Sequence, residues 1–403
     1  MGTPWPQVNV AIRGSRGEKG SFHRFAKMGK HLVFVGGGHA HLTALSKLQE
    51  YIRRGHKVTL ISPSPHQYYS GMAPGMLSGI YRPQQIRFHV RKLAEDRGAE
   101  FLGDWVTEIR PRERFLSLKS GRKVPYDVVS FNTGSEVPAE KFLSREAENI
   151  FPVKPVFHFL SGRRFILSAA PQTLKRFLVA GGGPAGVELT ANLCRLLAEI
   201  GGGGKITLIG GKRLLSGAPE KVRTLALKFF QDRGIDVLEG AHAQEFRKNG
   251  VTLQDGRNLE FDAAFLAVGI RPSPIFRESG VPVGEGGELL VDSFLRSPAY
   301  PEIFGGGDCI ALVGVRLAKV GVYAVRQNPV LFHNLMAALE GGSLRRFVPQ
   351  QDFLAILNMG FGRGILWRKG WVWEGRLAFL LKDYIDRAFM KKFQVSGELG
   401  EGE

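Results

Sequence analysis

The residues with the clearest chemical meaning are three glycines between an apolar stretch and a helical pattern. Within residues 177–188, Gly181, Gly183 and Gly186 have the spacing that lets a strand turn tightly into a helix and lets backbone approach a pyrophosphate. The N-terminus of the helix that follows offers free N–H groups and a positive dipole end to phosphates. This stretch therefore predicts a site for a dinucleotide.

An earlier stretch, residues 31–41, repeats the pattern with two departures. His41 stands at the third glycine position, so we expect helix and strand to lie slightly farther apart there. Ser62 ends the next predicted strand, where the fingerprint has an acidic residue that holds a ribose hydroxyl. Two such loops predict one chain that binds two dinucleotides. The residues expected to contact the first of these are Gly36, Gly38, His39, Ala40 and Ser62.

The second half also lacks the ribose-binding acid, because Gly210 follows the strand predicted at residues 205–209. Lys212 and Arg213 stand just beyond it. A cation at this place can accommodate a 2′-phosphate, which indicates NADPH. The alternative is that both residues are solvated loop charges.

The elements that position these loops also recur along the chain. An apolar strand followed by a glycine closes both halves, at residues 126–135 with Thr133 and Gly134, and at residues 261–272 with Gly269. A further strand, residues 303–309, ends in Gly-Asp-Cys. The halves therefore share their opening and closing motifs, as expected of two similar α/β domains.

Together these motifs resemble those of the two-dinucleotide-binding flavoproteins, a family that includes type II NADH dehydrogenases, sulfide:quinone oxidoreductases and pyridine nucleotide-disulfide reductases. The resemblance covers roughly residues 30–390. It implies Rossmann-like FAD-binding and NAD(P)H-binding domains and a C-terminal α+β region. The domain bounds expected are 28–150 with 283–345 for FAD, 151–282 for NAD(P)H, and 346–403 for the C-terminal region.

The same resemblance assigns roles to individual residues. Gly307 and Asp308 would hold the ribityl chain of FAD, and Thr133 with Gly134 would line its path. The nicotinamide would lie beside Glu188, with Gly269 nearby. Glu188 would be one of three catalytic residues. The other two would be Lys319, a cation near the flavin, and Gln327, which would lie near the flavin and the acceptor. The alternative for Lys319 is an exposed helix turn.

A narrower similarity is to the flavoprotein fused to, or encoded beside, selenophosphate synthetase. It is carried by the loop at 36–41, by residues 69–75 and by residues 380–390. It implies a redox partner that acts on a selenium or sulfur species. A metal role for His39 and His41 is not expected, because no further ligands stand nearby in the sequence.

Cysteine usage separates the branches of the family. Cys194 and Cys309 are the only two cysteines in the chain, and neither has the CxxC spacing of a metal or redox pair. Residues 63–90, a stretch that reads either as a substrate-facing loop or as a packed irregular segment, contain none. We expect Cys194 to pack in the core. The sequence therefore favours hydride transfer from NAD(P)H to flavin, and then to a quinone-like acceptor, with no redox disulfide in a reducing, cytoplasmic compartment.

The net charge of +18 would attract anionic cofactors, an anionic membrane surface or nucleic acid. The basic residues are scattered and form no compact run or RNA-binding motif, which argues against nucleic acid. Residues 1–27 are basic and acid-poor; we expect a disordered extension, with a transit peptide or a translation start at Met28 as alternatives.

The C-terminal region predicts a helix at 330–340, aromatic strands within 353–373 and a basic amphipathic helix at 376–393. Such a helix suits the cytoplasmic face of an anionic membrane. Its alternative is to bury its apolar stripe against the flavin domain or a dimer mate. The missing ribose acids also leave open a protein that binds both cofactors without catalysis.

Overall fold

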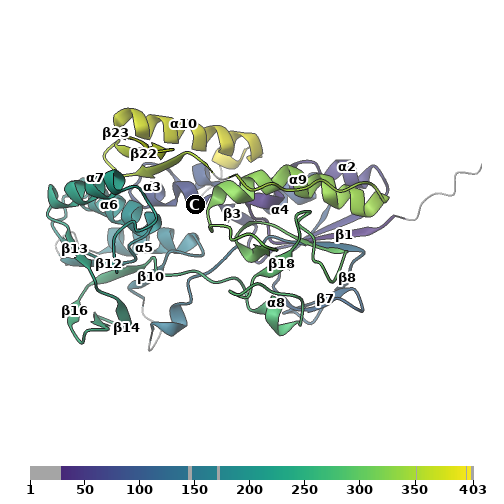
Figure 1. Cartoon of the computed structure of the whole chain (residues 1–403), viewed down its shortest axis with the longest axis horizontal. Coiled ribbons are helices and arrows are strands. Elements are labelled where there is room, and N and C mark those ends of the chain that lie inside the picture. The colour runs from purple at the N-terminus through teal and green to yellow at the C-terminus, as the bar shows by residue number, and fades with distance from the viewer. Residues whose placement is uncertain (1–28, 144–147, 170–172, 351, 396, 401–403) are drawn as a thin grey trace, which may run out of the picture.

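The computed structural model describes residues 29–400 except 144–147, 170–172, 351 and 396, so the prediction for residues 1–27 lies outside the described residues. Two five-stranded parallel sheets form the framework, one in each half of the molecule (Figure 1). Their central strands are almost entirely apolar because helices cover both faces. This is the α/β class predicted from the repeated motifs.

The first sheet has the strand order β19-β9-β1-β2-β5. Its strands are β1 (His31–Val35), β2 (Lys57–Ile61), β5 (Glu100–Leu102), β9 (Val128–Phe131) and β19 (Ile303–Gly305). The strand β19 comes from far along the chain, so the turn after it reaches the same sheet edge as the first glycine loop. The helices of this half are α1 (Leu42–Ser46), α2 (Leu48–Ile52), α4 (Val90–Glu95) and α9 (Gly321–Glu340).

The second sheet has the order β10-β17-β11-β12-β13. Its strands are β10 (Ile150–Pro152), β11 (Arg176–Ala180), β12 (Lys205–Gly211), β13 (Asp236–Glu239) and β17 (Ala263–Leu266). Its helices are α5 (Phe157–Ser168), α6 (Pro184–Glu199) and α7 (Glu220–Gln231).

Each half also carries a small antiparallel sheet before its closing strand. In the first half this is β6 (Val106–Arg110), β7 (Phe115–Leu118) and β8 (Lys123–Pro125); in the second it is β14 (Ala243–Arg247), β15 (Gly250–Leu253) and β16 (Asn258–Glu260). The link between the halves adds α8 (Ile275–Glu278), and β18 (Leu289–Val291) paired with β20 (Ile310–Leu312). The two halves thus repeat one sequence of elements.

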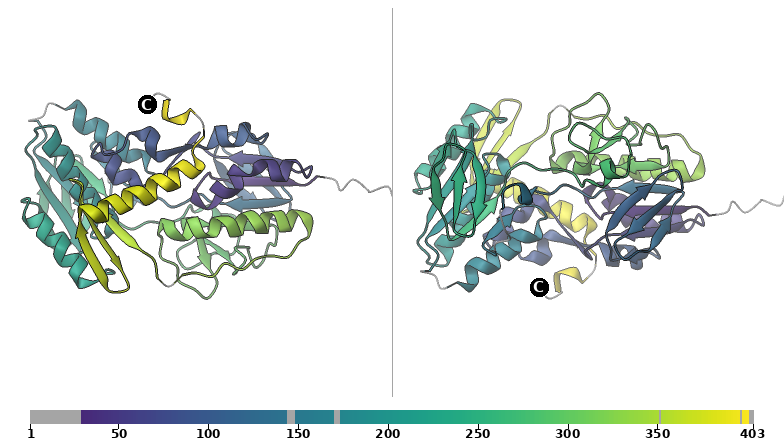
Figure 2. Two further views of the ribbon diagram at one scale, coloured as in Figure 1. Left: turned by 90° about the horizontal axis from the view of Figure 1, so that it is seen from above. Right: turned by 90° about the horizontal axis from the view of Figure 1, so that it is seen from below.

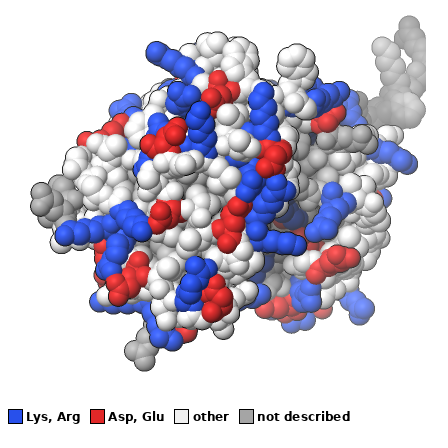
Figure 3. All heavy atoms as spheres, turned by 60° about the vertical axis from the view of Figure 1, so that its left-hand side comes forward, with Lys and Arg blue, Asp and Glu red and all other residues white. Residues whose placement is uncertain are grey.

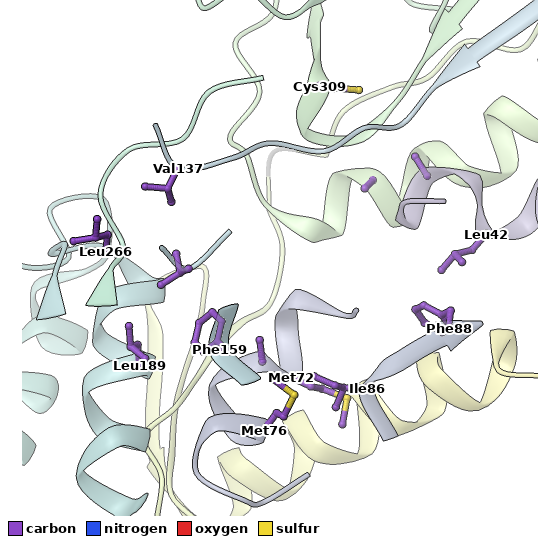
Figure 4. Close-up of a cluster of buried hydrophobic side chains, with 14 of the residues drawn as sticks. Leu42, Met72, Met76, Ile86, Phe88, Val137, Phe159, Leu189, Leu266 and Cys309 are labelled. Carbon is purple, nitrogen blue, oxygen red and sulfur yellow. The ribbon is translucent and has the colours of Figure 1, made fainter. Parts of the chain in front are cut away.

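The stretch at residues 63–90 is packed rather than open. It folds into β3 (His66–Tyr68) paired with β4 (Arg87–His89), and between them lie the 3-10 turns η2 (Ser70–Met72) and η3 (Pro83–Ile86) and the short helix α3 (Ala73–Leu77). Figure 4 shows Met72 and Met76 close to Ile86 in this cluster, and all three side chains are buried.

The C-terminal region combines the antiparallel strands β21 (Ala355–Asn358), β22 (Gly364–Arg368) and β23 (Trp371–Gly375) with α10 (Arg376–Phe393). In Figure 2 (left), α10 lies in yellow across the molecule and reaches from the second half toward the first. The bounds of α10 agree with the sequence prediction. The helix predicted at 330–340 is longer, because α9 begins at Gly321 and continues through Pro329.

The helical stretch after the first glycine loop is interrupted. The 3-10 turn η1 (His39–His41) precedes α1, and Lys47 separates α1 from α2 with a non-helical φ of −117° and ψ of 22°. Among the described residues, no helix is both long and apolar enough to cross a bilayer.

Candidate functional site

The first glycine loop lies directly against the end of β9. Gly36 has φ +84°, and a Cβ there would lie 2.3 Å from the Asn132 carbonyl oxygen. A Cβ at Gly38 would lie 1.6 Å from the Asn132 Oδ1. Both positions therefore require glycine, one for its backbone conformation and both for close approach. The loop fits a bound pyrophosphate because its backbone carries no side chain at these points.

The third position of this loop is filled by a neutral histidine. His41 is fully buried, with its Nδ1 2.7 Å from the Gly36 carbonyl oxygen and its Nε2 2.8 Å from the Ser130 hydroxyl. Burial lowers the pKa of His41 to about 4, so the ring is uncharged at neutral pH. The wider spacing of helix and strand expected here stays a prediction.

The second loop keeps the full fingerprint. Gly181 has φ +138°, and a Cβ at Gly186 would lie 1.8 Å from the Gly181 carbonyl oxygen, so the helix start packs tightly on the loop. Gly183 precedes α6 as its N-cap, and nothing lies within 4 Å of the position of its Cβ. Space is therefore open beside the N-terminus of α6, where the fingerprint places a phosphate.

Ser62 and Gly210 stand at the positions where the fingerprint has a ribose-binding acid, and neither carries a carboxylate. Ser62 is buried and donates to the Ser64 carbonyl oxygen at 3.0 Å. In the second half, Lys212 and Arg213 are exposed, and Arg213 is paired with Glu220. The structure adds a carboxylate that sequence reasoning missed. Glu239 at the end of β13 lies next to Gly210, whose Cβ position is 3.6 Å from the Glu239 Cγ.

Glu239 is held in place and ionised. Its Oε1 accepts from the Leu214 backbone N–H at 2.6 Å, and its Oε2 pairs with Arg223 at 2.5 Å. The Leu214 N–H and then Arg223 lower the pKa of Glu239 below its ordinary value. A signal was present in the sequence, since Glu239 ends the strand next to β12.

The turn after β19 places Asp308 at the same edge as the first loop. Asn132 joins the two, because its Nδ2 donates to the Gly306 carbonyl oxygen at 2.9 Å while its Oδ1 faces Gly38. Gly307, with φ +77°, donates its N–H to the Gln327 Oε1 at 2.6 Å. Gln327 is fully buried on α9, and its Nε2 has no hydrogen-bond partner.

Asp308 has a cationic partner that the sequence did not predict. Its Oδ2 accepts from the Lys154 Nζ at 2.5 Å and from the Ser135 hydroxyl at 2.8 Å. Burial alone would raise the pKa of Asp308, but the Lys154 ion pair outweighs it and holds the pKa below its ordinary value. Lys154 follows β10, so this side chain crosses from the second sheet to the first.

Lys319 lies just before α9 and is only a quarter exposed, so the exposed helix turn is not what the structure has. Its Nζ donates to the Ile310 carbonyl oxygen at 2.7 Å and pairs with Glu288 at 3.2 Å. Thr133 and Gly134 follow β9 at the same edge as Asp308, whereas Gly269 is exposed after β17.

Glu188 lies in the first turns of α6 and faces the C-terminal region. Its Oε1 accepts from the Asn358 backbone N–H at 2.7 Å. Burial raises the pKa of Glu188 to about 7, against the opposing effects of Lys382 and the Asn358 N–H. This carboxyl group can therefore exchange a proton near neutral pH.

A buried polar cluster joins Glu188 to α10. Lys382 is 11% exposed; its Nζ donates to the Gly71 carbonyl oxygen at 2.7 Å and pairs with Asp386 at 2.7 Å. The Tyr69 hydroxyl donates to the other oxygen of Asp386 at 3.0 Å. Lys382 is therefore a buried charge on the inner side of α10, and these partners compensate its burial.

His39 connects this cluster to the first glycine loop. Its ring lies edge-on to Tyr69 at 5.3 Å and near Phe389 at 6.1 Å between centroids. Burial lowers the pKa of His39 to about 4, and its Nε2 has no hydrogen-bond partner. No group of His, Cys, Asp or Glu among the described residues is arranged to hold a metal ion.

The two cysteines are unpaired. Cys309 is fully buried beside Asp308, and burial raises the pKa of its thiol. Cys194 is only partly buried on α6, at the margin of the core rather than inside it as expected. Neither thiol is part of a dithiol.

The outer side of α10 and β23 is apolar and open to solvent within this chain. Tyr384 is 72% and Trp371 is 83% exposed. We define the apolar face as Trp371, Trp373, Leu377, Leu380, Leu381, Tyr384 and Ile385, all of them exposed. The alternative that α10 buries this stripe against the flavin domain is therefore wrong for these residues, whereas burial against a dimer mate stays untested.

The fold and the two glycine loops define a flavoprotein with two Rossmann-like halves. The chain belongs to the pyridine nucleotide-disulphide oxidoreductase family, whose description matches residues 30–332. Members of this family are enzymes that use FAD and NAD(P)H, and the chain is accordingly a flavin-dependent oxidoreductase.

Among its relatives is the type II NADH:quinone oxidoreductase of Haemophilus influenzae, 24% identical over 366 residues that cover 79% of this chain and 82% of the relative. An internal alternative NAD(P)H-ubiquinone oxidoreductase A1 of Arabidopsis thaliana mitochondria is 26% identical over 208 residues, 46% of this chain and 40% of the relative. The chain thus spans less than half of that relative's length.

Similar solved structures show the same fold. The structure of NDH2 from Plasmodium falciparum in complex with NADH has a TM-score of 0.75 at 15% identity and covers 92% of this chain and 96% of that one. The sulfide:quinone oxidoreductase of Aquifex aeolicus has a TM-score of 0.73 at 19% identity, with 91% of each chain covered.

Proposed function

We propose that this chain is an NAD(P)H dehydrogenase that passes electrons through FAD to a quinone-like acceptor without a redox disulfide. The proposal rests mainly on one observation. The loop at Gly36 and the turn at Asp308 meet through Asn132 at one sheet edge, and no dithiol accompanies them. The names of the Haemophilus and Arabidopsis relatives support a quinone as the acceptor class.

In this proposal FAD, when bound, supplies the acceptance of a hydride and the onward transfer of electrons. The backbone at Gly36 and Gly38 holds its pyrophosphate, and Asp308 holds its ribityl chain. The second loop and the N-terminus of α6 hold NAD(P)H. Glu188, close to the start of the same helix, exchanges a proton near the nicotinamide, while Gln327 orients the flavin through Gly307.

We further propose that the enzyme contacts lipid at the cytoplasmic face of a membrane through the apolar face. Aromatic side chains such as Trp371 and Trp373 suit the interface between water and lipid. The basic residues near this face are Arg376, Arg387, Lys391 and Lys392, which would attract anionic headgroups. Basic and acidic side chains are otherwise interspersed over the surface in view in Figure 3. A second copy of the chain is the alternative occupant.

A selenium or sulfur species is the second candidate acceptor, and one observation favours it. The three stretches that carry the resemblance to the selenophosphate synthetase-associated flavoprotein lie together, because Tyr69 contacts His39 and Phe389 and bonds to Asp386. Contacts of this kind between distant motifs suit a common binding surface.

The test is an acceptor screen that follows NADH and NADPH oxidation with and without anionic liposomes. We expect either nucleotide to bleach the flavin without added thiol, and a short-chain quinone to turn over faster than selenite. An oxidised spectrum that persists under excess NADH and NADPH would refute hydride transfer. Faster turnover of the selenium compound would favour the second candidate.

Lipid contact is tested with Leu380→Ser combined with Tyr384→Ser. Both side chains are exposed, so folding should change little, whereas the loss of two inserted side chains should weaken liposome binding at least about tenfold. Leu167→Ser, on α5 and 46% exposed, is the matched control and should bind as the wild type does. Equal sedimentation of both variants with liposomes would contradict lipid contact through this face.

A further inference from the structure

The ion pair between Lys154 and Asp308 joins the two halves at the proposed flavin site. Lys154 follows β10 of the second sheet, whereas Asp308 follows β19 and Ser135 follows β9 of the first. The Lys154 Nζ lies 2.5 Å from the Asp308 Oδ2 and 2.8 Å from the Ser135 Oγ. Lys154 is 23% exposed and Asp308 16%, so water screens this charge only partly.

The other cation expected near the flavin is bound to groups other than Asp308. Lys319 pairs with Glu288, whose side chain is only 14% exposed, and donates to the Ile310 carbonyl oxygen. His39 also lies close enough to interact electrostatically with Asp308 and Lys154, but burial keeps its ring neutral at pH 7. Lys154 is thus the cation in direct contact with the residue that would hold the ribityl chain.

Reduction would add negative charge to a flavin whose ribityl chain is held by Asp308, the residue that Lys154 contacts. Hydride transfer from NAD(P)H adds two electrons and one proton to the flavin, so the reduced ring carries one negative charge unless a second proton follows. A fixed cation in a partly desolvated site stabilises such a charge with little reorganisation. The first glycine loop fits the cofactor, because Gly36 and Gly38 carry no side chain and let its backbone lie directly against Asn132.

We propose that Lys154 is the positioning cation that sets how readily the flavin is reduced. It is supplied by the nicotinamide-binding half and anchored on Asp308 and Ser135. The inference rests on the proposed flavin site but not on the identity of the acceptor. It assigns to Lys154 the electrostatic role that the family resemblance gave to Lys319.

The experiment measures the midpoint potential of the FAD-loaded, full-length enzyme against reference dyes. The variants are Lys154→Met, Lys154→Gln, which keeps a donor for Asp308 without the charge, and Lys154→Arg, which keeps the charge. For both uncharged variants we expect the ratio of reduced to oxidised flavin at a fixed potential to fall at least about tenfold, or about 30 mV for a two-electron couple. Lys154→Arg should restore the ratio to within about threefold of wild type, since the charge remains.

Lys319→Met is the discriminating variant. Its Nζ bonds to the Ile310 carbonyl oxygen and to Glu288 rather than to Asp308, so we expect a smaller change in the ratio than in Lys154→Met. A wild-type potential in Lys154→Met together with a shift in Lys319→Met would overturn the proposal. Loss of FAD from both uncharged variants would also overturn it, since the role of Lys154 would then be to retain the cofactor. Chemical reduction during the titration keeps the result independent of NAD(P)H turnover, so failure of the proposed dehydrogenase activity is seen separately.

Discussion

Gly36 and Gly55 offer a matched pair for testing the flavin cradle. Both glycines have a left-handed backbone, with φ +84° and +87°, but they differ in their surroundings. A Cβ at Gly36 would lie 2.3 Å from the Asn132 carbonyl oxygen, whereas nothing lies within 4 Å of the corresponding position at Gly55. Comparing Gly36→Ala with Gly55→Ala therefore separates close approach from backbone strain.

The expected magnitudes follow from this geometry. The left-handed conformation costs an alanine roughly 1–2 kcal/mol, so Gly55→Ala should lower the free energy of unfolding by about that amount. Gly36→Ala should lower it by an additional roughly 1–3 kcal/mol, because backbone cannot yield as a flexible side chain can. The displaced loop should also weaken FAD binding at least about tenfold, whereas Gly55→Ala should leave FAD affinity unchanged.

Urea unfolding of the apoproteins gives the stability differences, and fluorescence titration with FAD gives the affinities. The decisive quantity is the difference between the two variants, since the strain from φ is common to both. Equal losses of stability in both, with FAD affinity unchanged in Gly36→Ala, would refute the argument that the loop must approach Asn132 closely to form the site.

Two further predictions concern the buried polar cluster. The pKa of Glu188 is raised to about 7 from an ordinary value of 4.5, so between these pH values the folded state holds a proton that the unfolded state releases. The free energy of unfolding of wild type relative to Glu188→Gln should therefore fall by up to about 3 kcal/mol between pH 4.5 and 7. A constant difference between the two proteins in urea unfolding across that range would contradict the raised pKa. Lys382→Met should lower the free energy of unfolding by about 3–5 kcal/mol, because Asp386 loses its buried partner. The control Lys391→Met, at an exposed position, should stay within about 0.5 kcal/mol of wild type. Equal effects of the two variants in urea unfolding would show that Lys382 is not a member of a buried ion pair.

Elements whose signals lie in adjacent residues could be predicted from the sequence. The helix at 376–393 has the bounds of α10 because its amphipathic pattern and the preceding Gly375 are local signals. The second glycine loop was predictable for the same reason, since its turn, its close approach and its helix start occupy adjacent residues. The long helix α9 was predicted too short, because Pro329 inside it breaks the usual pattern of a helix interior.

Contacts between distant residues could not be predicted from local patterns. Lys154 and Asp308 form an ion pair across the two sheets, and only the fold brings them together. Lys382 has the sequence context of a surface charge, yet the Gly71 carbonyl, supplied by a distant segment, and Asp386 make its burial tolerable.

The two glycine loops differ in how the start of the following helix packs against the loop. Gly186 must lack a side chain because its Cβ position lies 1.8 Å from the Gly181 carbonyl oxygen. At the equivalent place, His41 instead inserts a neutral ring that bonds to the Gly36 carbonyl oxygen and to Ser130. The first loop therefore replaces tight packing with two hydrogen bonds, which explains why it departs from the fingerprint while Gly36 and Gly38 still lie against Asn132.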